Sequence, residues 1–316
     1  MTLTSSVFRL ALLRCLPCLL PALLLCGCGP STTKEKVERQ KKLSEERLRD
    51  SLALKIAVTP TLDCLPFYVA SECGIFDTLG VQVSLKCKTA QMDCDVAMQK
   101  GEVECKVSDL MRTERLLRLG TPLHYLGATN AYWQMIGNRK ARIKDIKSLG
   151  DKMVAMTRYS ATDYLATLAI DSVKPSNPVF RIQVNDVYVR LMMLLNNEMD
   201  AVMLPEPQAS EARRVNHPVL LDSREKDIHL GVIAVHLTRV ADERRQHQLA
   251  LLTQGYDMAC DSLNEKGLKH YADIIKKYCH TKDATVKTLP PLSFPHLSPP
   301  RQKDINRTRN VKWRTS

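Results

Sequence analysis

The chain has 316 residues, of which 44% are hydrophobic and 25% are charged, and its formal net charge is +12. At about 100–200 residues per domain, this length suits two lobes or one large split domain. The hydrophobic content excludes a disordered or fibrous chain, and 12 Gly and 16 Pro exclude a collagen-like one.

Residues 1–27 are interpreted as a signal peptide. Arg9 and Arg14 precede an apolar run from Cys15 to Leu25, which is too short for a bilayer-spanning helix of about 20 residues. The following Leu25-Cys26-Gly27-Cys28 resembles the bacterial lipobox, which implies that Cys28 carries a lipid and becomes the mature N-terminus. An ordinary secretory signal cleaved nearby is the alternative.

Residues 28–52 are expected to form a charged tether after the lipidated Cys28. Charges of both signs fill Lys34 to Arg49, which suits a solvated helix or a flexible spacer that holds the body off the membrane.

From Leu52 onward the pattern alternates between short apolar strands and helices. A first group of strands is predicted at Lys55–Thr59, Val81–Lys86, Val103–Val107 and Leu123–Gly127. Between them, helices are predicted at Phe67–Cys73 and from Asp93, as the capping residue, to about Lys100. These repeating units indicate a mostly parallel, doubly wound α/β sheet.

A second group of similar units follows. Strands are predicted at Met153–Met156, Phe180–Val184, Ala201–Leu204 and Ile228–His236. Helices are predicted at Ile143–Leu149, after the capping box Ser160-Ala161-Thr162-Asp163, at Asp186–Asn196, after Pro205-Glu206-Pro207, and at Thr238–Glu265 and Leu268–Cys279.

The last segment, residues 301–316, is a basic C-terminal tail with six basic side chains and one acidic one. No zinc-finger, RNP or helix-turn-helix pattern accompanies this charge, so no nucleic-acid partner is predicted. A solvated terminal segment is expected instead.

Seven cysteines remain after the signal peptide, and an odd number leaves at least one thiol unpaired. Disulfides are possible outside the cytoplasm, but small buried thiols in a reducing environment are the simpler interpretation. No C-x2-C pair remains in the mature chain, so no metal site is predicted, and no cofactor motif is present.

The order of these segments resembles the type II periplasmic substrate-binding proteins of ABC transporters, in the branch that serves nitrate, alkanesulfonate and thiamine-pyrimidine uptake. The resemblance is carried by Lys55-Ile-Ala-Val-Thr-Pro, Leu65-Pro66-Phe67-Tyr68-Val69-Ala70, Gly101-Glu102-Val103-Glu104, Ile146-Lys147-Ser148-Leu149-Gly150-Asp151-Lys152 and Glu198-Met199-Asp200-Ala201. One departure is that Thr89-Ala90-Gln91-Met92-Asp93 replaces the family's Gly- and Ser-rich ligand loop.

The resemblance implies two α/β lobes, each a doubly wound, mostly parallel sheet, joined by two crossings near Thr129–Gln134 and Ile233–His236. Residues 53–131 plus 235–300 would form the first lobe and residues 132–234 the second. The implied function is that of an exported solute-binding lipoprotein on the periplasmic or outer face of the cell membrane. It would act as a monomer and deliver a small organic molecule to an ABC permease and its ATPase.

Ligands of open α/β sheets bind beyond the carboxyl ends of the strands. The loops expected there give these candidate ligand-binding residues: Thr59, Asp63, Cys64, Gln91, Met92, Asp93, Asp109, Trp133, Arg158, Ser160, Ala161, Thr162 and Glu206. Helix capping also accounts for Asp93, Ser160 and Thr162, and packing for Trp133.

The candidate carboxylates (Asp63, Asp93, Asp109 and Glu206) outnumber the one candidate cation, Arg158. A desolvated site of this kind disfavours an inorganic anion such as nitrate or sulfate. The expected ligand is a neutral or amine-bearing organic molecule with one polar or anionic end facing Arg158 and Ser160.

Catalysis is not predicted. The chain has no G-x-S-x-G, H-E-x-x-H, P-loop or G-x-G-x-x-G motif, and its eight His are scattered. Two alternatives stay open: an enzyme on the same fold, of the pyrimidine-precursor or chorismate type, and a lipoprotein scaffold that binds protein partners.

Overall fold

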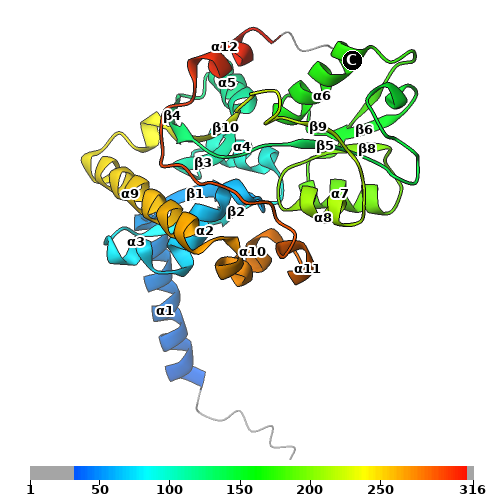
Figure 1. The fold of residues 1–316 in the computed structure, drawn as a ribbon. Coiled ribbons are helices and arrows are strands. Elements are labelled where there is room, and N and C mark those ends of the chain that lie inside the picture. The colour runs from blue at the N-terminus through cyan, green and yellow to red at the C-terminus, as the bar shows by residue number, and fades with distance from the viewer. Residues whose placement is uncertain (1–31, 312–316) are drawn as a thin grey trace, which may run out of the picture. The chain divides into compact units, whose positions relative to one another are not determined.

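The structure is a computed structural model that describes residues 32–311, so the expected signal peptide and Cys28 lie outside the described residues. The chain divides into two units, residues 1–47 and 48–316 (Figure 1). Helix α1 (Thr32–Leu52) spans the boundary, and its side chains are exposed from residue 35 to 44. Of the two alternatives for the tether, the structure has the solvated helix.

The first lobe contains a five-stranded sheet with the order β2-β1-β3-β10-β4. In it, β1 pairs in parallel with β2 and β3, whereas β10 pairs antiparallel with β3 and β4. The strands are β1 (Leu54–Val58), β2 (Val83–Cys87), β3 (Cys105–Asp109), β4 (Leu123–Ala128) and β10 (Gly231–His236).

The second lobe repeats this plan in a sheet with the order β7-β6-β8-β5-β9. Here β6 pairs in parallel with β7 and β8, and β5 pairs antiparallel with β8 and β9. The strands are β5 (Gln134–Gly137), β6 (Met153–Met156), β7 (Phe180–Gln183), β8 (Ala201–Leu204) and β9 (Val219–Asp222).

The two-lobed α/β architecture with mostly parallel sheets is therefore confirmed, and in each sheet a single strand, β10 or β5, runs against the other four. The antiparallel strands β5 and β10 are the first strands after each passage of the chain between lobes. A strand that enters from the neighbouring lobe has no crossover helix to impose a parallel direction. The periodicity of hydrophobic residues predicts strands and helices, but it does not show in which direction an individual strand runs.

The two passages between the sheets are residues 129–133 and 223–230. The first agrees with the expected crossing at Thr129–Gln134, and the second lies upstream of the expected Ile233–His236. The two passages come together at Gly231, the first residue of β10. Its carbonyl oxygen accepts a 3.0 Å hydrogen bond from the N–H of Thr129, the first residue of the first passage. A Cβ at this glycine would collide with the side chains of Thr129 and Ala131, so the close approach requires glycine.

Helices cover both faces of each sheet (Figure 1). In the first lobe, one face packs under α2 (Leu65–Glu72), α3 (Ile75–Thr78), α9 (Glu243–Lys266) and α10 (Ala272–Cys279), and the other under α4 (Gln91–Gln99) and α5 (Leu110–Arg118). In the second lobe, α6 (Ala161–Val173) covers one face, and α7 (Val187–Leu195) and α8 (Gln208–Arg214) cover the other.

The start of the basic C-terminal segment is not a solvated tail. It forms α12 (Gln302–Arg309), in which Asp304, Ile305 and Thr308 are buried. Ile305 packs in the cluster that contains Leu110 and Met111 of α5, so burial of these side chains holds the segment against the body.

Several local predictions also differ from the structure. Helix α4 begins at Gln91 with Ala90 as its cap, so Asp93 lies in the first turn and is not the capping residue. The predicted helix over 143–149 is only a 3-10 turn at Lys147–Leu149, and α9 begins at Glu243 after the cap Asp242 rather than at Thr238. The seven cysteines in the described part of the chain all have free thiols, in line with the simpler interpretation.

Candidate functional site

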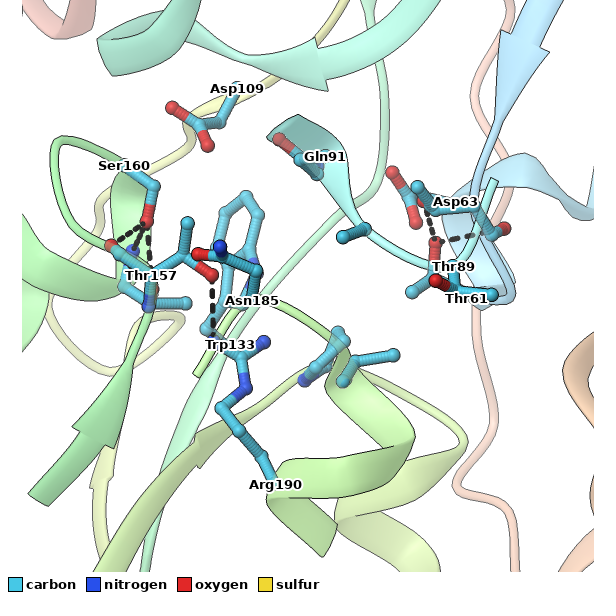
Figure 2. A pocket seen from close by; sticks show the side chains of 15 residues that line it. Thr61, Asp63, Thr89, Gln91, Asp109, Trp133, Thr157, Ser160, Asn185 and Arg190 are labelled. Carbon is cyan, nitrogen blue, oxygen red and sulfur yellow. Dashed lines mark hydrogen bonds between the residues drawn. The ribbon is translucent and has the colours of Figure 1, made fainter. Parts of the chain in front are cut away.

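A cavity of about 40 Å³ lies between the two lobes (Figure 2). Its wall is made by Thr59, Thr61, Asp63, Thr89, Ala90, Gln91, Asp109, Trp133, Thr157, Ser160, Thr162, Asn185, Val187, Arg190 and Pro205.

The topology brings these residues together at the carboxyl ends of parallel strands. Thr59 follows β1 and Asp109 ends β3 in the first lobe, whereas Thr157 follows β6 and Pro205 follows β8 in the second. Trp133 comes from the first passage between the lobes. The cavity therefore occupies the crevice in which open α/β sheets bind ligands.

The wall from the second lobe is built around the start of α6. The Ser160 hydroxyl accepts a 3.1 Å hydrogen bond from the Thr162 N–H and also donates to the Thr157 carbonyl oxygen at 2.7 Å. In a capping box the Asp163 side chain would accept a hydrogen bond from the Ser160 N–H. Here it accepts one from the Tyr159 N–H instead. The cap is confirmed for Ser160.

Arg190 of α7 is the cation of this site, and the sequence analysis did not single it out. Its side chain is 4% exposed, and Nη1 donates a 3.1 Å hydrogen bond to the Thr157 hydroxyl. Its buried Nε has no hydrogen-bond partner among the described residues. Burial lowers the pKa of this guanidinium to about 10. The only signal in the sequence was one arginine inside the apolar run of α7, directly after a strand.

The wall from the first lobe is rich in acceptors. Asp63 lies in the 3-10 turn Leu62–Cys64, and its carboxyl group is buried. Desolvation raises the pKa of this carboxyl group, and a hydrogen bond with Thr61 opposes the rise. Nearby, the amide oxygen of Gln91 is buried and has no hydrogen-bond partner among the described residues.

Asp109 connects the two lobes at the edge of the cavity. As the cap of α5, its carboxylate accepts a 2.9 Å hydrogen bond from the Arg112 N–H, and it also accepts from the N–H of Ala161 at the start of α6. Desolvation raises the pKa of this carboxyl group to about 6, although these hydrogen bonds and the Arg112 charge oppose the rise.

Seven of the thirteen candidate residues line the cavity: Thr59, Asp63, Gln91, Asp109, Trp133, Ser160 and Thr162. Three others lie beside it. Cys64 accepts a hydrogen bond from the Thr59 N–H through its sulfur at 3.4 Å, Met92 accepts one from the Gln183 amide at 3.4 Å, and Ala161 is buried at the start of α6.

The remaining three candidates have other surroundings. Asp93 is exposed on α4. Arg158 forms an ion pair with Asp163, at 3.5 Å between Nε and Oδ2. Glu206 is buried within the second lobe, where the Tyr132 hydroxyl donates to it at 2.7 Å and the Arg213 guanidinium at 2.7 Å. A linear sequence shows that such groups lie on a loop but not which way they point.

Within residues 32–311 there is no cluster of three or more His, Cys, Asp or Glu side chains that could hold a metal ion. In the same part of the chain, no helix is both long and apolar enough to cross a membrane.

Comparison with known proteins gives structural matches only. No protein-family model matches the chain, and neither does any curated protein. Among solved structures, the chain is similar to the zinc-bound ligand-binding component of an ABC-type import system from Staphylococcus aureus. The two are 12% identical, with a TM-score of 0.67 over 81% of this chain and 89% of that chain.

Two further structures have the same fold. The alkanesulfonate-binding protein from Xanthomonas axonopodis pv. citri, solved with bound MOPS, is 12% identical, with a TM-score of 0.68 over 81% of this chain and 90% of that chain. The periplasmic nitrate-binding protein from Synechocystis PCC 6803 is 15% identical, with a TM-score of 0.59 over 73% of this chain and 67% of that chain. The expected resemblance is thus confirmed at the level of the fold: this chain has the two-lobed α/β fold of the periplasmic binding proteins that serve ABC importers.

Proposed function

We propose that this protein is the extracytoplasmic solute-binding component of an ABC importer and captures a small organic molecule between its two lobes. The observation that carries the proposal is the cavity at the strand ends, to which both lobes and the first passage between them contribute side chains. A ligand there touches both lobes at once, so its binding energy favours the closed arrangement.

The same proposal includes delivery. A closed, ligand-filled protein would dock on the permease, whose ATPase then drives import. The lipidated Cys28 would anchor the protein to the cell membrane, with α1 as the spacer between the lipid and a monomeric body. The lipobox-like Leu25-Cys26-Gly27-Cys28 and the exposed face of α1 support this part.

Binding rather than catalysis is the role that the composition of the cavity supports. Its polar groups are mainly hydroxyls and amides, and the fifteen lining residues include no His, Cys or Lys. Hydroxyls and amides hold a ligand well. One lining group, Asp109, has a pKa raised to about 6, but its carboxylate already accepts the Arg112 N–H as the cap of α5, which favours a structural role over acid–base catalysis.

The test combines native mass spectrometry with small-angle X-ray scattering. The purified protein should carry a small molecule that is released on denaturation, and the unliganded protein should contract when that molecule is returned. A matched variant, Thr162→Trp, fills the cavity and should neither retain the molecule nor respond to it. Wild-type protein that carries no small molecule, and whose scattering is unchanged by a library of solutes, would contradict the proposal.

A further inference from the structure

The buried charges of this protein are nearly all paired. Lys106 and Arg112 both contact Asp95, the Arg213 guanidinium contacts Glu206, and similar partners surround the other buried carboxylates and cations. Among residues 35–44 and 50–311, the buried Asp, Glu, Lys and Arg side chains without an ion pair are Asp63, Asp109 and Arg190. All three line the cavity between the lobes.

Of these three, Asp109 is compensated by the protein itself. Two main-chain N–H groups, those of Arg112 and Ala161, donate to its carboxylate. Asp63 and Arg190 have partners from their own lobes only. Asp63 is approached by the Thr61 hydroxyl and by its own main-chain N–H. Arg190 donates to the Thr157 hydroxyl, and the charge of Asp186 acts on it without a direct ion pair. An isolated buried charge is costly, and such a cost is retained where a ligand supplies the partner.

The two charges lie on opposite walls. Asp63 belongs to the first lobe, beside Thr61 and Thr89, whereas Arg190 belongs to the second lobe, beside Thr157 (Figure 2). The buried polar atoms of the cavity wall that have no hydrogen-bond partner within the described part of the chain are divided between the two lobes in the same way. The free acceptor Gln91 Oε1 is in the first lobe, and the free donor Arg190 Nε is in the second. A matching ligand therefore donates hydrogen bonds at one end and accepts them at the other.

We infer that the ligand is a small zwitterion, whose carboxylate or sulfonate group binds Arg190 and whose ammonium group binds Asp63. This inference rests on the proposed function and specifies the substrate class of that site.

The charge pattern disfavours simpler ligands. An inorganic anion would satisfy Arg190 but would leave Asp63 buried and unpaired, and a plain amine would leave Arg190 in the same condition. The inference keeps the amine-bearing ligand expected from the sequence but changes the residues that bind it, because Arg158, Asp93 and Glu206 do not line the cavity.

The first experiment is calorimetry on wild-type protein freed of bound ligand. The probes are the zwitterions glycine, β-alanine, γ-aminobutyrate and taurine, with propionate, ethanesulfonate and nitrate as probes that lack the ammonium group. At least one zwitterion should bind 30-fold or more tightly than its ammonium-free analogue, since a buried charge-assisted contact contributes about 2–5 kcal/mol. Whether β-alanine or taurine binds more tightly identifies the acidic group as carboxylate or sulfonate.

The second experiment uses the variants Arg190→Met and Asp63→Asn. Each should lower the affinity for the best zwitterion at least 30-fold, and neither should lower the melting temperature of the unliganded protein, because each removes a buried charge that has no ion-pair partner. The matched controls are Arg181→Met and Asp93→Asn, which change the same residue types outside the cavity and should leave the affinity unchanged.

Three results would overturn the inference: no zwitterion binds, an ammonium-free probe binds as tightly as its zwitterion, or Arg190→Met retains full affinity. Each is distinguishable from failure of the proposed function. A co-purifying molecule without a zwitterionic structure that still closes the lobes would refute the substrate class while leaving the solute-binding role intact.

Discussion

The side-chain amide of Gln208, at the start of α8 in the second lobe, donates a 2.8 Å hydrogen bond to the main-chain carbonyl oxygen of Pro60 in the first lobe. A few residues away, the Leu62 N–H donates to the carbonyl oxygen of Glu206 at 2.9 Å. The loops that follow β1 and β8 are thus joined directly beside the cavity. Both contacts require the closed arrangement of the lobes, so they stabilise it.

Replacing Gln208 should therefore shift the protein toward an open form. Gln208→Ala removes one interlobe hydrogen bond and leaves a buried carbonyl oxygen without its donor, at a cost of about 1 kcal/mol. Scattering from unliganded protein should show an increased radius of gyration. In Gln246→Ala the lost hydrogen bond, to Val240, lies within the first lobe, and the radius should stay unchanged. Equal radii for Gln208→Ala and wild type would show that the contact has no part in closure.

The raised pKa of Asp109, about 6 against an ordinary 3.8, predicts a pH dependence of stability. Between these values the folded protein holds a proton that the unfolded chain has lost. The contribution to stability is therefore fully present below about pH 4 and is lost as the pH rises to 6, a change of at most about 3 kcal/mol. Asp109→Asn has no such titration. As the pH rises from 4 to 7, its free energy of unfolding, measured in urea, should therefore increase relative to that of wild type. A constant difference between the two proteins over this range would contradict the assignment.

Glu206 should act as a structural residue. Its carboxylate accepts hydrogen bonds from Tyr132, Arg213 and the Ser210 N–H, so Glu206→Ala leaves several donors unsatisfied and should destabilise the fold by about 3 kcal/mol. The partner of Glu211 on the same helix is the exposed Arg214, and Glu211→Ala should cost less than about 1 kcal/mol. Thermal unfolding measures both. A stable Glu206→Ala protein that has lost only ligand affinity would instead restore the role predicted from sequence.

The packing of α12 can be tested at Ile305. This side chain is 8% exposed and packs near Leu110 and Met111, so Ile305→Ala should lower the free energy of unfolding by about 2 kcal/mol. Val37→Ala changes an apolar side chain that is 60% exposed and should have almost no effect. If both variants were as stable as wild type, the C-terminal segment would behave as the solvated tail expected from its charge.

The proposed anchor predicts that Cys28→Ser releases the exported protein from membranes. Two or three acyl chains hold a protein stably, whereas removal of the acceptor thiol leaves none. Fractionation should move the variant to the soluble fraction, and intact-mass analysis should find the lipid only on wild type. Cys26→Ser is the matched control and should stay membrane-bound. An unmodified mature N-terminus at another residue would favour the ordinary secretory signal.

The sequence by itself determined the elements whose signals are local. Strands β6 and β8 lie at the predicted residues, because short apolar runs between turn residues specify strands directly. Ser160 caps its helix as predicted, because capping depends only on residues within one turn. The ordered set of such elements was sufficient to indicate the fold.

The tertiary structure alone decided which side chains meet. Arg190 lies in an apolar helix and was not among the predicted site residues, whereas Arg158 lies in the expected loop, yet of the two only Arg190 lines the cavity. Glu206 and α12 differ from expectation for the same reason: their partners, Tyr132 and α5, are about 70 and 190 residues away in the chain. Charge and position in a loop are properties of the sequence, but the direction of a side chain follows from packing between distant segments.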